Sequence, residues 1–481
     1  MKKRFYNTFL FVMVVFFATA QNESDALKFS QFLPSGTARY SAMGGAFSAL
    51  GADFSTMATN PAGIGLYRKS EVGVSTAWAS HNTTSEFNGT KKQANEFSFQ
   101  LANLGFVVAT PTANSSGWKS VNFGFSYNHM NDYNRAISIK GDNNESSLLD
   151  FQADALNNGI SNKNDNAYYL ADAVYFDTLS NKYVNDYQLP EPDRNYGAEQ
   201  AHQIKTSGYA GEYDFNISGN FRDFLYIGAT VGFQNIRYEQ TTYHNETPFN
   251  DIALKSFNST DYMYAKGNGF NFKFGVLLKI THLVRIGAAV HTPTIYNFRY
   301  DYWTNANATV EYADGVFDNS GKSPVGYYNW EFASPARYML SSAVVLGRLA
   351  IISGEVEYAD YSKMNMSASD YFFEEENSNI NNTYKGTFNA RLGAEVRLWI
   401  LSLRAGAGFF DSPYKSSEPN SEAYKIMLSG GLGINAGSLF FDASYQYVVG
   451  NEYYYMYEYE SSKVTLENNS HKFIATLGYR F

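Results

Sequence analysis

From residue 71 to the end of the chain, apolar and polar side chains alternate in segments of about ten residues or more. In the last segment, the odd positions from Phe473 to Phe481 are apolar or aromatic, and the even positions apart from Ile474 are polar or small. A period of two places the two sets on opposite faces of a strand. Soluble sheets usually have strands of five or six residues, so these lengths favour strands that cross a membrane.

The alternation predicts fourteen strands. They cover 71–80, 95–109, 118–132, 207–220, 224–243, 266–280, 284–300, 330–347, 349–361, 384–397, 400–410, 423–436, 438–449 and 469–481. The gap after every even-numbered strand up to the twelfth is short, and the other gaps are expected to be long and polar, the longest at about 133–206. Outer-membrane barrels sort short periplasmic turns and long outer loops in this way, whereas a soluble sandwich has no reason to do so. We therefore expect an all-β fold, a transmembrane antiparallel β-barrel over residues 71–481.

The first twenty residues have the features of a secretory signal peptide. Lys2, Lys3 and Arg4 precede an apolar run from Phe9 to Phe17, and Ala18-Thr19-Ala20 fits the small-x-small cleavage pattern. No later stretch has about 18 consecutive apolar residues, so no transmembrane helix is expected. The mature chain is predicted to be exported to the outer membrane of a Gram-negative bacterium.

Several functional classes lack support in the sequence. The chain has no Cys, which removes disulfides, thiol catalysis and Cys-ligated metals. A net charge of −9 without a basic stripe argues against nucleic acid. The run 431–436 fits a loose dinucleotide pattern but is followed by a strand, whereas the site needs a helix N-terminus. We expect no enzyme activity, no cofactor and no metal.

Residues 21–70 precede the first strand and have no strand or helix period of their own. The part from Ala38 to Leu66 is rich in Gly and Ala and carries the motif Asn60-Pro61-Ala62-Gly63. A fourteen-strand barrel is wider than an eight-strand one and would otherwise be an open pore. We therefore expect this segment to be a plug, or hatch, inside the lumen.

Charged residues of both signs fall on the predicted inward faces of the strands. They are Arg285, Glu355, Glu357, Arg391, Glu395, Arg397, Arg404, Asp442 and Arg480. One interpretation is a network of ion pairs that fills the lumen and holds the plug. The other is that one arginine binds the carboxylate of a ligand.

The loop at 133–206 contains two apolar patches, in which short amphipathic helices are expected. They include Leu148, Phe151, Leu170, Val174 and Phe176. The loop either packs on itself or forms an apolar groove above the mouth of the barrel.

The order Gly44-Gly45, Asp53 and Asn60-Pro61-Ala62-Gly63 resembles the hatch of the FadL/OmpP1/TodX family, outer-membrane transporters of hydrophobic compounds. The resemblance extends over the signal, the hatch, the fourteen strands and the terminal Phe481. A terminal aromatic residue is shared by most outer-membrane barrels as a signal to the barrel-assembly machinery. The segments 292–294 and 334–338 are similar to internal positions of the family, more weakly.

The resemblance implies passive uptake by a monomer in outer-membrane lipid. A hydrophobic ligand, such as a long-chain fatty acid, is caught among the outer loops and moves to a pocket in the barrel. A shift of the hatch, which includes Asn60, Pro61 and Ala62, and an inward kink in a strand then let it leave sideways through the wall. The alternative is a barrel component of a protein secretion or surface-anchoring system that transports no small molecule.

Overall fold

The structure is a computed structural model that describes residues 23–112, 117–188, 197–347, 349–369 and 371–481. The predicted signal peptide, residues 1–20, lies outside the described residues. Within them, nineteen strands form one antiparallel sheet. These strands are β1 (Glu71–Phe87), β2 (Thr90–Pro111), β3 (Trp118–Asp132), β4 (Arg135–Asn143), β7 (Ala198–Phe221), β8 (Leu225–Pro248), β9 (Leu254–Lys279), β10 (Val284–His291), β11 (Ile295–Tyr312), β12 (Gly315–Lys322), β13 (Gly326–Ala333), β14 (Arg337–Leu346), β15 (Ala350–Asp360), β16 (Asn365–Ser367), β17 (Gly386–Leu398), β18 (Leu401–Phe410), β19 (Lys425–Ala436), β20 (Leu439–Tyr455) and β21 (Lys463–Arg480).

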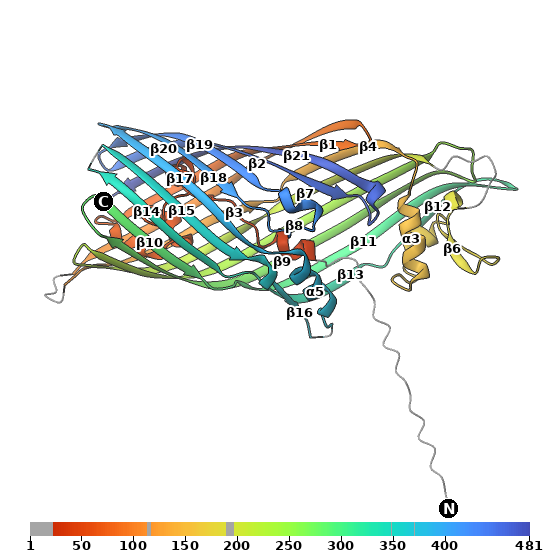
Figure 1. Ribbon diagram of the computed structural model, residues 1–481, viewed down its shortest axis with the longest axis horizontal. Coiled ribbons are helices and arrows are strands. Elements are labelled where there is room, and N and C mark those ends of the chain that lie inside the picture. The colour runs from red at the N-terminus through yellow and green to blue at the C-terminus, as the bar shows by residue number, and fades with distance from the viewer. Residues whose placement is uncertain (1–22, 113–116, 189–196, 348, 370) are drawn as a thin grey trace, which may run out of the picture.

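The sheet closes into a barrel because β1 pairs with β21, from Glu71 opposite Arg480 to Glu86 opposite Thr465. β3 continues into β4, β10 into β11 and β13 into β14, while β12 and β16 are short additions to their neighbours. Counted around the wall, the described residues therefore form fourteen strands, as the alternation predicts. Figure 1 shows them side by side and tilted, with the C terminus at one end.

The two ends of the barrel differ in their connections. Turns at the end that holds the C terminus are short; β7 and β8 are joined by 222–224, and β17 and β18 by 399–400. These short turns follow the even-numbered strands of the wall, as predicted. We call this end of the barrel the turn end. The connections on the loop side carry α3 (Leu148–Asn157), α4 (Ala167–Leu170), the small sheet of β5 (Tyr175–Asp177) and β6 (Lys182–Val184), and α5 (Glu374–Thr383). Figure 1 shows α3 and β6 at the end opposite the C terminus, the loop end, and α5 beside β16. α3 is a short helix of the kind expected in the first apolar patch. In the second patch α4 ends at Leu170, and Phe176 lies in β5 instead of a helix.

The outer face carries a band of exposed apolar side chains, and the alternate residues point inward. Phe215, Phe233 and Phe274 are about half exposed, whereas their neighbours Asp214 and Lys273 are buried. This is the opposite of a soluble protein and typical of a barrel in lipid. Among the described residues, no helix is both long and apolar enough to span a membrane.

The expectation that every loop-end gap is long was wrong for two of them. β1 and β2 meet in a two-residue turn, Asn88-Gly89, in which φ is 45° and 81°. β8 and β9 likewise extend to leave only 249–253 between them. These extensions continue past the apolar band toward the loop end, where both faces of a strand can be polar. They therefore lack the alternation of apolar and polar residues that marks the rest of the strands. The dipeptide Asn-Gly was the available signal, since it favours tight hairpins.

Two predicted strands, 284–300 and 330–347, are each interrupted by a proline. β10 ends before Pro293 and β13 ends before Pro335, because proline lacks the N–H that a strand ladder needs. The two breaks lie side by side. The Ser334 N–H donates to the Thr294 carbonyl oxygen at 3.0 Å, and the Thr294 N–H donates to Ser334 Oγ at 3.0 Å.

Backbone pairing is also interrupted between β2 and β3. β2 pairs with β3 only from Asn103 opposite Asn128 toward the turn end, while its residues 90–102 pair with β1 alone. Above this point the chain bends inward, and β4 lies behind β1, with Ser85 Oγ donating to the Ser138 carbonyl oxygen. Side chains bridge the break. Asp132 accepts a hydrogen bond from Ser98 and lies 3.3 Å from Nε2 of His81.

Candidate functional site

The N-terminal segment, residues 23–67, runs along the inside of the barrel. It comprises α1 (Glu23–Lys28), α2 (Ala38–Ala42), and the 3₁₀ helices η1 (Phe54–Ala58) and η2 (Pro61–Leu66). It lies so close to the wall that glycines there have no room for a Cβ. Such contacts join Phe54 to Gly105 of β2, Met57 to Gly124 of β3, Pro61 to Gly228 of β8, Met43 to Gly393 of β17 and Gly44 to Gly406 of β18. Since these strands stand on all sides of the cylinder, the segment lies between them.

Within this segment, residues 44 to 53 turn sharply and are held by side-chain contacts. Gly44 and Gly45 follow α2 with φ of 64° and 76°, a conformation that favours glycine. Asp53 is buried and caps η1, accepting hydrogen bonds from the Ser55 N–H at 3.0 Å and the Thr37 hydroxyl at 2.7 Å. Burial raises the pKa of the Asp53 carboxyl, and the charge of Arg39 opposes that rise.

The motif Asn60-Pro61-Ala62-Gly63 ties the segment to the wall and to itself. Asn60 is fully buried, and its Nδ2 donates to the carbonyl oxygens of Ser48 at 2.7 Å and Val276 of β9 at 3.1 Å. Its Oδ1 accepts from the Ala62 N–H at 3.1 Å and so caps η2. Gly63 leaves no room for a Cβ beside Thr56. One amide thus joins three backbone groups.

Replacing Asn60 is expected to release the segment from the wall. Asn60→Ala removes the hydrogen bond to Val276 and takes this partner from the Ser48 carbonyl oxygen and the Ala62 N–H. Each buried group left unsatisfied costs about 1–3 kcal/mol. A shift of about 2 kcal/mol raises the population of a displaced segment roughly thirtyfold. Ion conductance across a planar bilayer should therefore rise, with more frequent openings than in the unaltered protein.

The matched variant is Asn60→Asp, which keeps the acceptor for Ala62 but loses both donated hydrogen bonds. It should also conduct, since the link to β9 is lost. Conductance at the unaltered level in both variants would show that this side chain does not hold the segment.

The predicted inward charges form ion pairs with one another and with the N-terminal segment. Within the wall, Arg391 contacts Glu355 at 2.6 Å and Glu357 at 3.0 Å, and Arg404 contacts Glu395 at 2.7 Å and Asp442 at 2.6 Å. Arg397 adds a second arginine to Glu395 at 2.6 Å. Near the turn end, Arg480 contacts Glu71 at 2.5 Å.

Three of these charges hold the N-terminal segment directly. Glu395 also contacts Arg39 of α2 at 2.9 Å, and Glu355 accepts from the Ser48 N–H at 2.9 Å. Arg285 donates to the Leu50 carbonyl oxygen at 2.8 Å.

A second charge cluster, which was not predicted from the sequence, lies nearer the middle of the barrel. Lys273 of β9 is buried between Glu212 at 2.5 Å and Asp214 at 2.7 Å, both on β7. Arg337 of β14 contacts Glu357 at 3.3 Å. The sequence did contain a signal for these charges. Lys273 alternates with the outward Phe272 and Phe274, and Glu212 and Asp214 alternate with outward residues of β7, so a period of two places all three inside.

Toward the loop end the lumen becomes aromatic. The aromatic chamber, as we call it, is built by Tyr133, Tyr238, Tyr296, Phe298, Tyr300, Trp330 and Phe332. Phe29 of the N-terminal segment fills its centre and is fully buried, with its ring centroid 4.8 Å from Phe298 and 5.9 Å from Tyr238. Phe298 stacks on Trp330 at 5.0 Å. Nothing in the sequence around Phe29 has a period, so only the fold reveals this contact.

A cavity of about 80 Å³ lies between the N-terminal segment and the wall. Phe32, Pro34 and Met130 give it an apolar side, and Lys273 and Arg337 lie on its polar side. The paired proline breaks border it through Thr294 and Pro335 among others. Gln234, which is also in its lining, accepts a hydrogen bond from the Tyr296 hydroxyl of the aromatic chamber.

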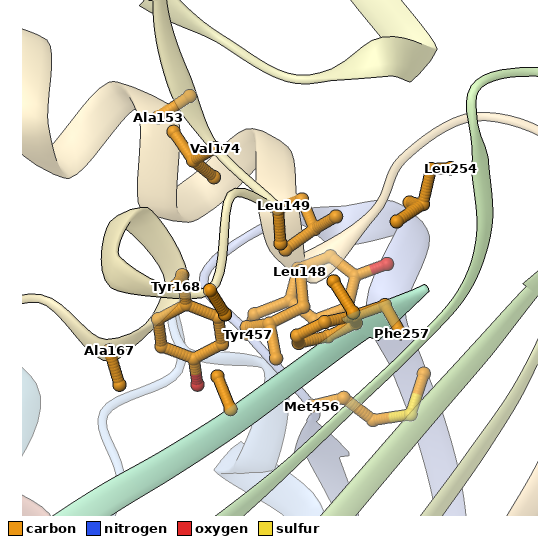
Figure 2. Close-up of a cluster of buried hydrophobic side chains, with 14 of the residues drawn as sticks. Leu148, Leu149, Ala153, Ala167, Tyr168, Val174, Leu254, Phe257, Met456 and Tyr457 are labelled. Carbon is orange, nitrogen blue, oxygen red and sulfur yellow. The ribbon is translucent and has the colours of Figure 1, made fainter. Parts of the chain in front are cut away.

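The residues predicted to form an apolar groove are divided between the interior and the surface of the loop. Leu148 and Val174 belong to a buried cluster with Leu149, Tyr168 and Phe257, shown in Figure 2. Phe151 packs against the edge of that cluster. Leu170 and Phe176 are each 42% exposed. The loop therefore has an apolar core of its own, anchored to β9 through Phe257.

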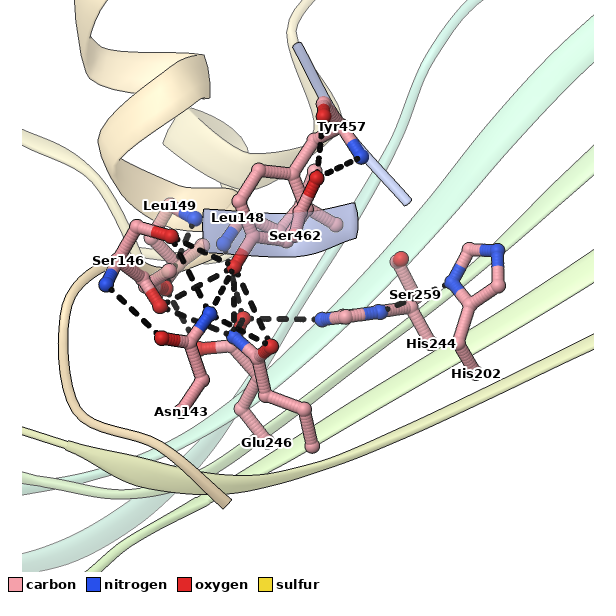
Figure 3. Close-up of polar contacts among 12 residues, drawn as sticks. Asn143, Ser146, Leu148, Leu149, His202, His244, Glu246, Ser259, Tyr457 and Ser462 are labelled. Carbon is pink, nitrogen blue, oxygen red and sulfur yellow. Dashed lines mark hydrogen bonds and ion pairs between the residues drawn. The ribbon is translucent and has the colours of Figure 1, made fainter. Parts of the chain in front are cut away.

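A buried polar network fastens this core to the strand ends, as Figure 3 shows. Glu246 of β8 accepts from the Leu148 N–H at the start of α3 at 2.9 Å and lies 2.9 Å from Nε2 of His244. Nδ1 of His244 lies 3.0 Å from Nδ1 of His202 on β7. The Tyr457 hydroxyl brings the last loop to the same network.

At the opposite end, Phe481 is 57% exposed and its N–H donates to the Ser70 carbonyl oxygen at 3.0 Å.

Solved structures with this architecture share little sequence with the chain. A FadL homologue from Pseudomonas aeruginosa superposes with a TM-score of 0.57 at 12% identity, over 94% of this chain and 99% of that one. The Pseudomonas putida toluene transporter TodX gives a TM-score of 0.50 at 12% identity, over 94% and 99%. No protein-family model and no curated protein matches the sequence. These structures confirm that the chain has the fold that the hatch motif predicted.

Proposed function

We propose that this chain is a gated outer-membrane channel for neutral hydrophobic small molecules. The observation that carries the proposal is the aromatic chamber, whose centre is occupied by Phe29 of the chain's own N-terminal segment. An apolar chamber inside a lipid-embedded barrel has the chemistry to take an apolar ligand. The barrels with the same fold include a toluene transporter, which supports this class of ligand.

The described state is closed, so transport requires movement. Ligand sites usually have about 300–1,000 Å³, and the cavity here has about 80 Å³. Displacement of Phe29 and the residues after it would join the aromatic chamber to that cavity. We infer that residues 21–70 act as a hatch, which the hydrogen bonds of Asn60 and the ion pair between Arg39 and Glu395 hold in the closed position.

The charges favour a neutral ligand over a fatty-acid carboxylate. Lys273 already lies between two carboxylates, and Arg337 contacts Glu357 and donates to the Ser30 carbonyl oxygen at 2.6 Å. A ligand carboxylate entering the cavity would compete with these partners and lose its own hydration. Long-chain fatty acids are therefore the second candidate ligand, and an uptake assay separates the two.

The break between β2 and β3 supports a lateral exit. Above Asn103 the backbone of β2 has no partner in β3, and only side chains such as Asp132 and Ser98 bridge the two. Separating β2 from β3 above Asn103 therefore breaks no backbone hydrogen bonds between these two strands. An apolar molecule that leaves here enters the bilayer without crossing water, which is where it is most stable. In this proposal the protein works as a monomer, inserted by the barrel-assembly machinery with Phe481 as its signal.

The test is uptake by cells with and without the protein, using labelled toluene and labelled oleate. We expect faster toluene uptake with the protein and a smaller effect on oleate. Phe298→Leu should slow toluene uptake several-fold, because an aromatic pair contributes about 0.5–1.5 kcal/mol. Phe388→Leu is the control, since Phe388 is 62% exposed on the outer face. Equal rates with and without the protein would refute the proposal.

A further inference from the structure

A row of cations crosses the outer face of three adjacent strands toward the loop end. Arg237 of β8 lies directly opposite Lys266 of β9, and Lys266 lies directly opposite Arg299 of β11. All three side chains are exposed. Opposite residues on neighbouring strands have Cβ atoms about 4.5–5.5 Å apart, and like charges so placed destabilise a sheet. The row therefore costs stability unless an anion lies over it.

Two of the three cations have no partner among the described residues. Arg299 is bound by Asp301 of its own strand at 3.1 Å. Over the residues that the structure describes, neither Arg237 nor Lys266 has an ion pair or a hydrogen bond from its side chain. The nearest acids by register are Glu239, opposite Tyr264, and Glu331, opposite Asn297, and neither forms an ion pair with the row.

The position of the row matches the headgroup layer of a membrane. Two residues toward the turn end are the amides Asn235, Asn268 and Asn297, and two further are Phe233, Phe270 and Ile295 of the apolar band. In the opposite direction, four residues from the cations, Tyr262 stacks on Trp303 with ring centroids 5.5 Å apart. Between the cations and this pair lies the row of Glu239, Tyr264 and Asp301. The order outward is thus apolar, amide, cation, a row with two acids, and then the stacked aromatic pair.

We propose that this face binds a phosphorylated glycolipid of the outer leaflet. Its acyl chains lie along the apolar band, its phosphates contact Arg237 and Lys266, and its sugars cover Tyr262 and Trp303. A phospholipid offers the phosphate but no sugar for the aromatic faces, so the sequence of rows favours the glycolipid. The inference rests on the proposed outer-membrane location and does not depend on the channel's ligand.

Native mass spectrometry of the full barrel in neutral detergent tests the site, with lipid A as the probe. The variant Arg237→Gln/Lys266→Gln should bind lipid A about 25-fold more weakly, because each cation near an anionic lipid surface contributes about fivefold. Dephosphorylated lipid A should bind both proteins equally weakly. Heat-modifiable mobility in gels establishes that the variant is folded.

The matched control is Lys91→Gln/Lys92→Gln, which removes two exposed cations at the β1–β2 hairpin of the same end. It should bind lipid A as the unaltered protein does. Equal affinity in the two double variants would overturn the site. Phosphatidylglycerol bound as tightly as lipid A by the unaltered protein would overturn the assignment to a glycolipid.

Discussion

Oxidation of a cysteine pair made by Asn60→Cys and Gly275→Cys is expected to stop uptake, and reduction is expected to restore it. A Cβ built on Gly275 lies 3.0 Å from Cγ of Asn60, whose place a cysteine sulfur would take. A sulfur bonded at about 2.04 Å to its partner lies about 3.0 Å from that partner's Cβ. Pro61 Cδ, 2.9 Å from the same Cβ, has to move slightly. The chain has no Cys that could compete.

The measurement is toluene uptake before and after treatment with a reductant. Because a hatch bonded to β9 cannot leave the wall there, the oxidised form should be slower by about tenfold or more. The reduced form should leak, since it lacks Asn60. Each single variant should be insensitive to the reductant. Equal uptake by the oxidised and reduced forms would mean that the hatch does not move away from β9 during transport.

Removal of Arg391 is expected to destabilise the barrel strongly. Its side chain is 4% exposed and lies between Glu355 and Glu357. Without it Glu355 would be left buried without a cation, and Glu357 would keep only Arg337. Breaking one partner of a buried ion pair typically costs about 3–5 kcal/mol. Arg391→Met should lower the free energy of unfolding by that amount, measured by urea unfolding in phospholipid vesicles with tryptophan fluorescence.

Two further variants separate charge from packing. Arg391→Met combined with Glu355→Gln should recover most of the stability, because the remaining carboxylate, Glu357, keeps its ion pair with Arg337. Lys91→Met, which breaks an exposed pair with Glu86, should cost at most about 1 kcal/mol. A loss for Arg391→Met as small as for Lys91→Met would contradict a buried network that supports the fold.

The sequence was sufficient for the wall of the barrel where the wall meets lipid. There an outward Phe233 or Phe270 alternates with an inward polar residue, so parity assigned Arg391, Glu355 and Glu395 to the interior. Farther toward the loop end, at 81–87, 244–248 and 254–265, many outward positions are polar too, so the contrast disappears and these strand extensions were predicted as loops. Pro293 and Pro335 show a third case, since each interrupts a strand that the alternation alone predicts as continuous.

The candidate site was less predictable because its parts come from distant segments. Asn60 was found from its motif, but its hydrogen bond to Val276 depends on the register of β9. Phe29 lies in a segment without a period, and no local pattern indicates that it enters an aromatic chamber. The members of the apolar loop patch looked alike in sequence, and only packing separates the buried Val174 from the exposed Leu170.

The pairing of β1 with β21 has a consequence for how the molecule is made. The first and last strands of the wall are neighbours, so the cylinder cannot shut until the final residues of the chain have been synthesised. The segment that ends up inside is made before either strand. It is therefore available to be enclosed while the seam forms, without having to enter a finished barrel through one of its ends.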